Sequence, residues 1–242
     1  MSKILGIKID ELSKDQVLKK ILEFLKSNNI NQNLHQIATV NPEFILAAQK
    51  DEEFKKVLNN TDLSVPDGVG LKFAGQYIGE RITGVDLTWE LAKIASTNDY
   101  SIFFLGAKEG IAKKAASIMK QKYPKLKIAG TYAGNPNEKG IVKRINDVHA
   151  DILLVAFGAP KQDKFIANNK ISLNVKVAMG VGGTFDYIAK IVPRAPKWMR
   201  SLGLEWFYRV IRQPSRIKRI FNATIKFPIL VICSRFSNRH SE

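Results

Sequence analysis

One acidic residue stands directly after an apolar run of strand length. Asp67 follows residues 62–66 (DLSVP) and lies between a proline and a glycine. In an open α/β sheet, ligands bind beyond the carboxyl ends of the strands, so a carboxylate in such a place is a candidate site residue. An Asp-Gly pair is also a common turn, so a purely structural role is the alternative.

Two polar residues follow another apolar run, in the segment TVNPEF (39–44). Asn41, with Pro42 after it, has the residue types of a helix N-cap and the first helical position. That cap accounts for Asn41 and Pro42 but gives Thr39 no structural role. Thr39 is therefore a candidate for chemistry.

Glycine-bearing turns follow two further apolar runs, in FLGAKEG (104–110) and MGVGGTFD (179–186). Such turns let backbone N–H groups approach a phosphate at the start of the next helix. Neither matches the glycine patterns of dinucleotide-binding or ATP-binding loops, and a lone glycine turn is usually only a turn. Two of them in one sheet favour phosphate binding.

A third segment, FGAPKQDKF (157–165), ends an apolar run in Gly-Ala-Pro and then opens a helix. Pro160 is ordinary in a first helical turn. Lys161 and Gln162 would both point into the mouth of a crevice, one as a cation and the other as a neutral donor and acceptor. Simple surface exposure is the alternative for both.

The sequence offers no obvious metal site. Its three histidines are far apart, its single cysteine cannot form an intrachain disulfide or a thiolate zinc cluster, and no Asp-x-Asp pair occurs. No G-x-S-x-G elbow supplies a serine nucleophile. We therefore expect neither a metal nor a cofactor.

Basic charge is concentrated at the end of the chain. From Arg194 onward there are eleven Lys or Arg against two acids, which is more than half of the formal net charge of +16. The stretch EWFYRVIRQPSRIKRIF (205–221) repeats arginine every three or four residues, so on a helix the arginines share one face and apolar side chains another. Such a stripe could meet a nucleic acid, a membrane surface or an anionic substrate.

The first 190 residues supply a frame that could bring these candidates together. Apolar runs predict strands at 36–40, 62–66, 101–106, 127–132, 152–158 and 176–183, and amphipathic stretches predict helices at 13–26, 108–123 and 137–150. Ser13 and Gln16 have capping-box spacing. Apolar strands that alternate with helices predict a Rossmann-like α/β fold, a mostly parallel sheet with helices on both faces. Ligands bind beyond the carboxyl ends of such strands, where the candidates stand.

A change in composition at IVPRAPKW (191–198) divides the chain. It predicts an α/β domain at 1–193 and a basic, amphipathic, helical appendage at 194–242. The longest late apolar run has seven residues, at 227–233, whereas a membrane span needs about 20. Residues 1–10 have no signal-peptide pattern, so we expect a cytoplasmic protein.

The chain resembles the WecG/TagA/CpsF family of bacterial glycosyltransferases over about residues 36–220. The matching segments occur in the family's order: TVNPEF, LNNTDLSVPDGVG, ERITGVDL, FFLGAKEG, ILLVAFGAPKQDKF, VAMGVGGTFD and RAPKWMRSLGLEWFYRVIRQPSRIKR. The most specific are GAPKQ and the set GVGGTFD, RAPKW and GLEWFYR. Asp163 is a small departure, because glutamate is more usual after PKQ.

The resemblance implies an activity and a site. Members transfer a sugar, often N-acetylmannosamine or its uronic acid, from a UDP-sugar to undecaprenyl-diphosphate-linked N-acetylglucosamine, with inversion and without a metal ion. The product enters wall teichoic acid or another surface polymer. Asp67 would be the catalytic base, Thr39 would lie in the same pocket, and the glycine turns would seat UDP. The implied binding residues are Asn41, Arg81, Gly106, Gly158, Lys161, Gln162, Gly182, Gly183 and Asp186.

The resemblance also gives the basic appendage two roles. Departing UDP gains negative charge, and positioned arginines can stabilise it as a metal ion would. We expect Arg209, Arg216 and Arg219 to do so, and Arg212 least, because it lies just before Pro214 at an expected helix break. The apolar face would dock on the inner face of the cell membrane, where the polyprenyl-diphosphate acceptor lies. A homo-oligomer is another way to cover that face.

Two other functions fit parts of the sequence. A pI of about 9.8 and the interleaved arginine and aromatic residues suit a nucleic-acid-binding protein, although the charge is confined to a short segment and no nucleic-acid-binding module is recognisable. We therefore expect no nucleic-acid partner. A non-catalytic scaffold at the membrane surface is the second alternative, and it would leave Asp67 dispensable.

Overall fold

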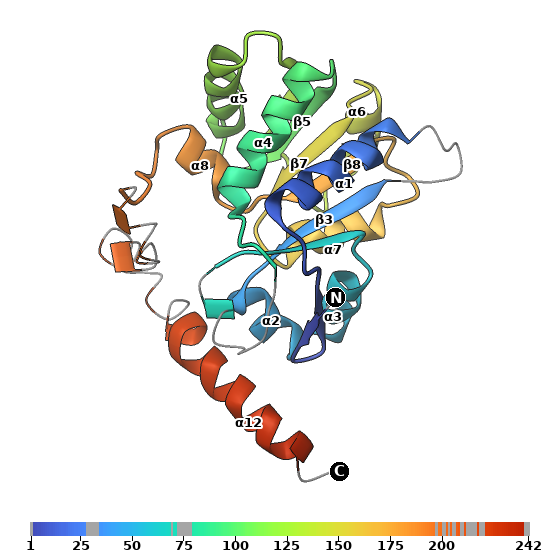
Figure 1. The fold of residues 1–242 in the computed structure, drawn as a ribbon. Helices are drawn as coiled ribbons and strands as arrows, with labels where there is room; N and C mark the ends of the chain where they lie inside the picture. Colours follow the sequence, from blue (N-terminus) through green and yellow to red (C-terminus); the bar gives the residue numbers. More distant parts are fainter. Residues whose placement is uncertain are drawn as a thin grey trace.

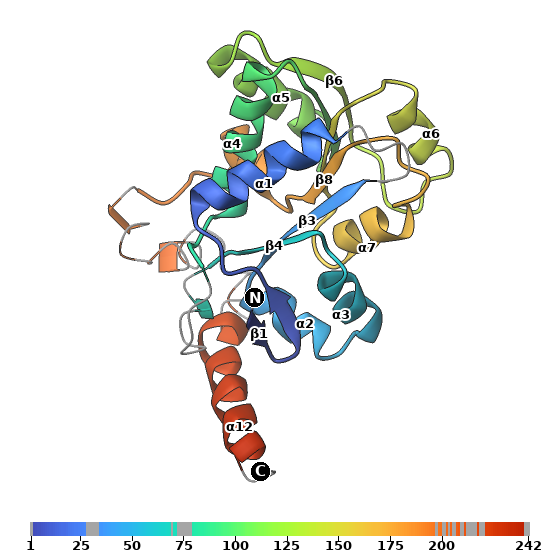
Figure 2. The ribbon, with the colours of Figure 1, turned by 45° about the vertical axis from the view of Figure 1, so that its right-hand side comes forward.

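Six strands form one parallel sheet in the order β4-β3-β8-β7-β5-β6 (Figures 1 and 2). The computed structural model describes residues 2–27, 34–68, 70–71, 79–196, 198–199, 202, 204, 207–208, 211, 217 and 221–239. The strands of this sheet are β3 (His35–Val40), β4 (Leu63–Pro66), β5 (Ser101–Gly106), β6 (Lys127–Tyr132), β7 (Ile152–Ala156) and β8 (Val177–Gly180). Each corresponds to one of the six predicted apolar runs, and the predicted α/β class is confirmed.

Helices follow the strands and cover both faces of the sheet. They are α1 (Lys14–Lys26), α2 (Pro42–Ala48), α3 (Glu52–Asn59), α4 (Gly84–Thr97), α5 (Ile111–Lys122), α6 (Ile141–Asn146), α7 (Lys161–Asn168) and α8 (Thr184–Ile188). The C-terminal segment adds the π-helix η3 (Asn222–Lys226) and α12 (Phe227–Arg239). Ser13 and Gln16 form the predicted capping box at the start of α1. Gly110 and Gly140 adopt positive φ just before α5 and α6, so these helices begin later than predicted.

Alternate side chains of the strands build two separate core layers. On one face, residues such as Ile37, Phe104 and Leu154 pack against α1, α4, α5 and α8. On the opposite face, residues such as Phe103 and Leu153 pack against α6 and α7 (Figure 2). Successive side chains of a strand point to opposite faces, so an apolar strand needs a helical cover on each side.

A third cluster joins the two ends of the chain. An antiparallel hairpin that sequence reasoning did not predict, β1 (Ser2–Ile4) and β2 (Ile7–Ile9), turns through Leu5 and Gly6, which both have positive φ. The hairpin's isoleucines pack with α2, α3 and the side chains of Phe227 and Val231 from α12. Figures 1 and 2 show α12 leaving the body beside α2 and the N-terminus. A helical C-terminal segment is thus confirmed, whereas the boundary at 193 stays a prediction.

No helix in the described part of the chain is both long and apolar enough to cross a membrane.

Candidate active site

A cavity of about 430 Å³ lies beyond the carboxyl ends of β3, β4, β7 and β8. Its walls come from the segments that follow these four strands, from the first turn of α4, and from Ala223 and Thr224 of η3. This is the position expected for a ligand in an open α/β sheet. The C-terminal segment therefore returns to the sheet and completes one wall.

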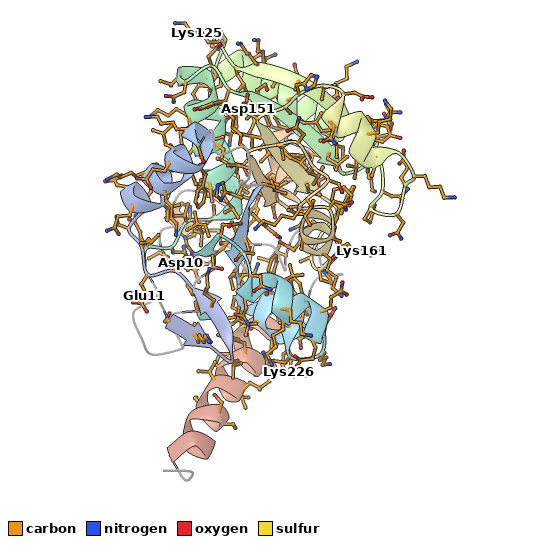
Figure 3. All side chains as sticks on the ribbon, turned by 90° about the vertical axis from the view of Figure 1, so that its right-hand side faces the viewer. Asp10, Glu11, Lys125, Asp151, Lys161 and Lys226 are labelled. Atoms are coloured by element: carbon orange, nitrogen blue, oxygen red, sulfur yellow. The ribbon has the colours of Figure 1, made fainter. Side chains whose placement is uncertain are left out.

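The structure brings most of the sequence-predicted site residues into this cavity. Those that line it are Thr39, Asn41, Asp67, Arg81, Gly158, Gln162, Gly182, Gly183 and Asp186. Two others do not. Gly106 is buried at the end of β5, where an added Cβ would lie 2.8 Å from a ring carbon of Phe157. Lys161 is exposed at the outer side of α7 (Figure 3).

The tail arginines of the sequence prediction, Arg209, Arg212, Arg216 and Arg219, lie outside the residues that the structure describes. Their roles stay predictions.

Asp67 is held at the N-terminus of α4. Its backbone N–H donates to the carbonyl of Val40 at 2.7 Å, and its side-chain Oδ2 accepts the N–H of Gly84 at 3.2 Å. The hydroxyl groups of Thr39 and Thr184 both lie close to Gly84, the residue whose N–H bonds Asp67. A Cβ added to Gly84 would lie 3.3 Å from Thr39 Oγ1 and 3.9 Å from Thr184 Oγ1. The start of a helix favours a negative charge, and the Asp67 carboxylate lies at such a start.

Asn41 has a simpler role in this structure. Its side chain accepts the N–H of Phe44 at 3.0 Å and so caps α2, with Pro42 at the first helical position. The predicted cap is confirmed, and it places Asn41 on the wall of the cavity.

Gln162 joins the two turns that follow β7 and β8. Its side-chain Oε1 accepts the N–H of Gly158 at 3.1 Å and the N–H of Gly182 at 2.8 Å. The side chain is almost completely buried, and a Cβ added to Gly180 would lie 2.5 Å from its Nε2. These two N–H groups are thus occupied by Gln162 and are not offered to a phosphate.

Several residues of the cavity wall were missed by sequence reasoning, Thr83 and Gly84 among them. Thr83 caps α4, because its hydroxyl accepts the N–H of Asp86 at 3.1 Å. The Thr-x-x-Asp spacing of residues 83–86 is a capping-box pattern, so the sequence did carry a signal for this helix start.

Among the described residues, no group of three or more His, Cys, Asp or Glu side chains is arranged to hold a metal ion.

The residue after Gln162 has a buried carboxyl group, which has no ion-pair partner in the described part of the chain. Asp163, in the first turn of α7, is fully buried, and neither oxygen has a hydrogen-bond partner of ordinary geometry among the described residues. Burial raises its pKa to about 7, although the Gln162 amide and its own backbone N–H act in the opposite direction. The Asp163 backbone carbonyl accepts a hydrogen bond from Gln36 at 3.0 Å.

Wild type should lose stability as pH rises to neutral because of Asp163, and we expect Asp163→Asn to abolish this loss. In the native state the pKa of Asp163 lies above its unfolded value of 3.8, so the native protein binds more protons and stability falls as pH rises from about 4 to about 7. The difference between the native and unfolded pKa values corresponds to a decrease of at most about 4 kcal/mol in the free energy of unfolding. Urea unfolding of both proteins between pH 4 and pH 8.5 measures this loss, and the variant should gain stability relative to wild type as pH rises.

The comparison isolates Asp163 because other carboxylates are common to both proteins. Asp51, for example, has a lowered pKa because Lys164 donates a hydrogen bond to it. A stability difference between variant and wild type that does not change with pH would show that Asp163 is charged in the native state.

Comparison with known proteins assigns the family. The model of the Glycosyl transferase WecG/TagA/CpsF family matches residues 2–241. The chain belongs to this family. It is 37% identical over 211 residues, 85% of this chain and 82% of the relative, to the N-acetylglucosaminyldiphosphoundecaprenol N-acetyl-beta-D-mannosaminyltransferase of Bacillus subtilis (strain 168).

Two proteins of the same name from Staphylococcus aureus, strains MRSA252 and MW2, are each 32% identical over 222 residues. These alignments cover 90% of this chain and 87% of each relative. The resemblance inferred from the motifs is confirmed, as is the predicted enzyme class, a glycosyltransferase of the WecG/TagA/CpsF family.

Proposed function

We propose that the protein transfers N-acetylmannosamine from a UDP-sugar to undecaprenyl-diphosphate-linked N-acetylglucosamine, with inversion at the sugar. The observation that carries the proposal is the cavity itself. In a chain that matches the transferases along most of its length, Asp67 lies in the cavity at the N-terminus of α4, close to Thr39. A family member with such a carboxylate has the base that inverting transfer requires.

In the proposed reaction, a hydroxyl oxygen of the acceptor attacks the anomeric carbon of the donor sugar. The bond from that carbon to the β-phosphate oxygen breaks, UDP leaves with the electron pair, and the hydroxyl proton passes to the Asp67 carboxylate. The Gly84 N–H, 3.2 Å from Oδ2, holds the carboxylate toward the cavity. Thr39, which also lines the cavity, can contact the acceptor or the donor sugar.

The leaving diphosphate needs positive charge and hydrogen-bond donors. Arg81 lies on the cavity wall and can supply both. The chain also reaches the wall at Ala223 and Thr224, directly after the basic stretch, which supports the assignment of Arg209, Arg216 and Arg219 to the leaving group. We place the diphosphate near Gly183 and Arg81, because Gln162 occupies the N–H groups of Gly158 and Gly182.

The far side of the C-terminal segment fits a membrane surface. One face of α12 is buried through Phe227 and Val231. The exposed residues Ile229 and Ile232 of α12 and Ile225 of η3 are spaced three and four residues apart. An apolar stripe beside a basic segment suits the inner surface of the cell membrane, where a lipid-linked acceptor would be found. We propose a peripheral association there.

The proposal predicts transfer by the purified protein in a defined mixture. With vesicles that contain undecaprenyl-diphosphate-linked N-acetylglucosamine, UDP-N-acetylmannosamine should give a lipid-linked disaccharide that mass spectrometry detects. UDP-N-acetylmannosaminuronic acid, UDP-N-acetylglucosamine and UDP-glucose are the competing donors. Equal transfer from UDP-glucose, or none from any donor, would refute the proposed substrate.

The same mixture with EDTA tests the expectation of metal-independent transfer. Activity should persist, because arginine side chains take the place of a divalent ion in the proposal. Loss on chelation that Mg²⁺ or Mn²⁺ restores would show that a metal ion takes part.

A further inference from the structure

Arg194 forms an ion pair and a hydrogen bond with residues at the start of α4. Its Nη1 donates to Asp86 Oδ1 at 2.7 Å and its Nη2 donates to Asp86 Oδ2 at 2.8 Å, a bidentate ion pair. Nη2 also reaches the hydroxyl oxygen of Thr83 at 3.1 Å. The Arg194 side chain is 20% exposed, so the pair is partly shielded from water. Charge-assisted, two-pronged bonds of this kind fix geometry as well as add energy.

That turn carries the N–H group that holds the proposed base. Thr83 is the N-cap of α4, and Gly84, the first residue of the helix, donates its N–H to Asp67 Oδ2 at 3.2 Å. The cap does not need Arg194, because the Thr83 hydroxyl bonds both the N–H and Oδ2 of Asp86. Arg194 is thus not required to cap the helix. Its contacts instead hold the first turn of α4 in a fixed position.

Arg194 also joins two walls of the cavity. It follows a turn in which the N–H groups of Ile191 and Val192 donate to the carbonyl of Asp186, at 2.9 Å and 3.2 Å. Asp186 belongs to the wall formed by α8, and Thr83 belongs to the wall formed by α4. A short segment anchored at Asp186 therefore reaches across to α4 through the Arg194 side chain.

We infer that Arg194 is a positioning residue for sugar transfer: through Thr83 and Asp86 it fixes the first turn of α4, and so the Gly84 N–H that orients the Asp67 carboxylate. This inference rests on the proposed role of Asp67 as the base. It gives the segment after α8 a part in catalysis that does not involve contact with the substrate.

The test compares Arg194→Ala and Arg194→Lys with wild type at saturating donor and acceptor. We expect kcat to fall about 10- to 100-fold for alanine, because small misplacements of a catalytic group are costly. Lysine should recover part of the loss, since it keeps the charge but cannot bond Asp86 in two places. The KM for the donor should change much less, because Arg194 is not among the residues that line the cavity.

A pH–rate profile supplies a readout that a merely structural role would not move. An N–H that donates to a carboxylate favours its charged form, so a displaced Gly84 should move the acid limb of kcat to higher pH. The other titratable groups on the cavity wall, Glu43, Arg81, Asp186 and Tyr187, are the same in every variant.

Lys170→Ala is the matched control. It removes a partly buried ion pair, Lys170 Nζ to Asp62 Oδ2 at 2.7 Å, between residues that do not line the cavity. It should leave kcat and the acid limb unchanged. Urea unfolding of each variant shows that it is folded, and if Arg194→Ala does not fold, Arg194→Lys and Asp86→Asn carry the test.

The inference and the proposed function can fail separately. If Asp67→Asn retains transfer, Asp67 is not the base and the proposed function is revised. If Asp67→Asn loses transfer but the Arg194 variants keep wild-type kcat and an unmoved acid limb, only the positioning role is wrong. In the Asp67→Asn background, Arg194→Ala should lower the residual rate less than it does in wild type, because the two residues act as a unit.

Discussion

Asp67→Asn is expected to slow sugar transfer about 10²- to 10⁴-fold, the range typical of a lost general base. The amide has nearly the volume of the carboxylate and can still accept the N–H of Gly84 at Oδ, so the cavity should keep its shape. Binding of UDP, measured by calorimetry, should therefore stay close to that of wild type. Turnover at saturating substrates measures the loss.

The matched control is Asp99→Asn, which neutralises a carboxylate that pairs with Lys127 outside the cavity lining. It should leave turnover unchanged. If Asp67→Asn keeps more than about a third of wild-type turnover under these conditions, another residue takes the proton. Loss of UDP binding together with turnover would mean instead that Asp67 shapes the donor site.

The sheet was predictable because its strands are buried on both faces. Segments such as ILLVA and IFFL are continuous apolar runs, and a parallel sheet under two layers of helices is the environment that such runs require. The points at which β7 and β8 end and their turns begin were predicted less accurately. The predicted strands at 152–158 and 176–183 extend past the observed ends, because Gly158 and Gly182 adopt positive φ and leave the strand.

Position at the edge of the sheet was predictable, but the direction of each side chain was not. Lys161 and Gln162 are consecutive on α7, and consecutive helical residues point about 100° apart, so the cavity receives one and solvent the other. Gly106 lies at the correct edge but packs against Phe157 instead of lining the cavity.

The other features that sequence reasoning missed depend on contacts between segments that are far apart in the sequence. Arg194 and Asp86 are 108 residues apart, and no local pattern pairs them. Both hairpin strands are only three residues long and have a lysine in the middle, so they give little periodic signal. Their burial depends on α12, which comes from the other end of the chain.

Phe227→Ala is expected to lower the free energy of unfolding by about 3–5 kcal/mol, the usual cost of truncating a buried phenylalanine. Phe227 is fully buried in the cluster that holds Ile7 and Phe44, so its loss leaves a cavity between α12, the hairpin and α2. Urea unfolding at fixed pH measures the change. Truncation near residue 193 would remove Val231 as well, so we expect the shortened chain to be less stable than the full one.

Ile229→Ala is the matched control, because this residue lies on the same helix but is 55% exposed. It should leave the free energy of unfolding nearly unchanged, and instead weaken binding to vesicles that contain anionic lipid, in keeping with roughly 0.8 kcal/mol per buried methylene. Phe227→Ala at temperatures where it is folded should bind those vesicles as wild type does. If Phe227→Ala unfolds at the same urea concentration as wild type, α12 is not part of the core. If Ile229→Ala binds vesicles as wild type does, its exposed face is not the membrane surface.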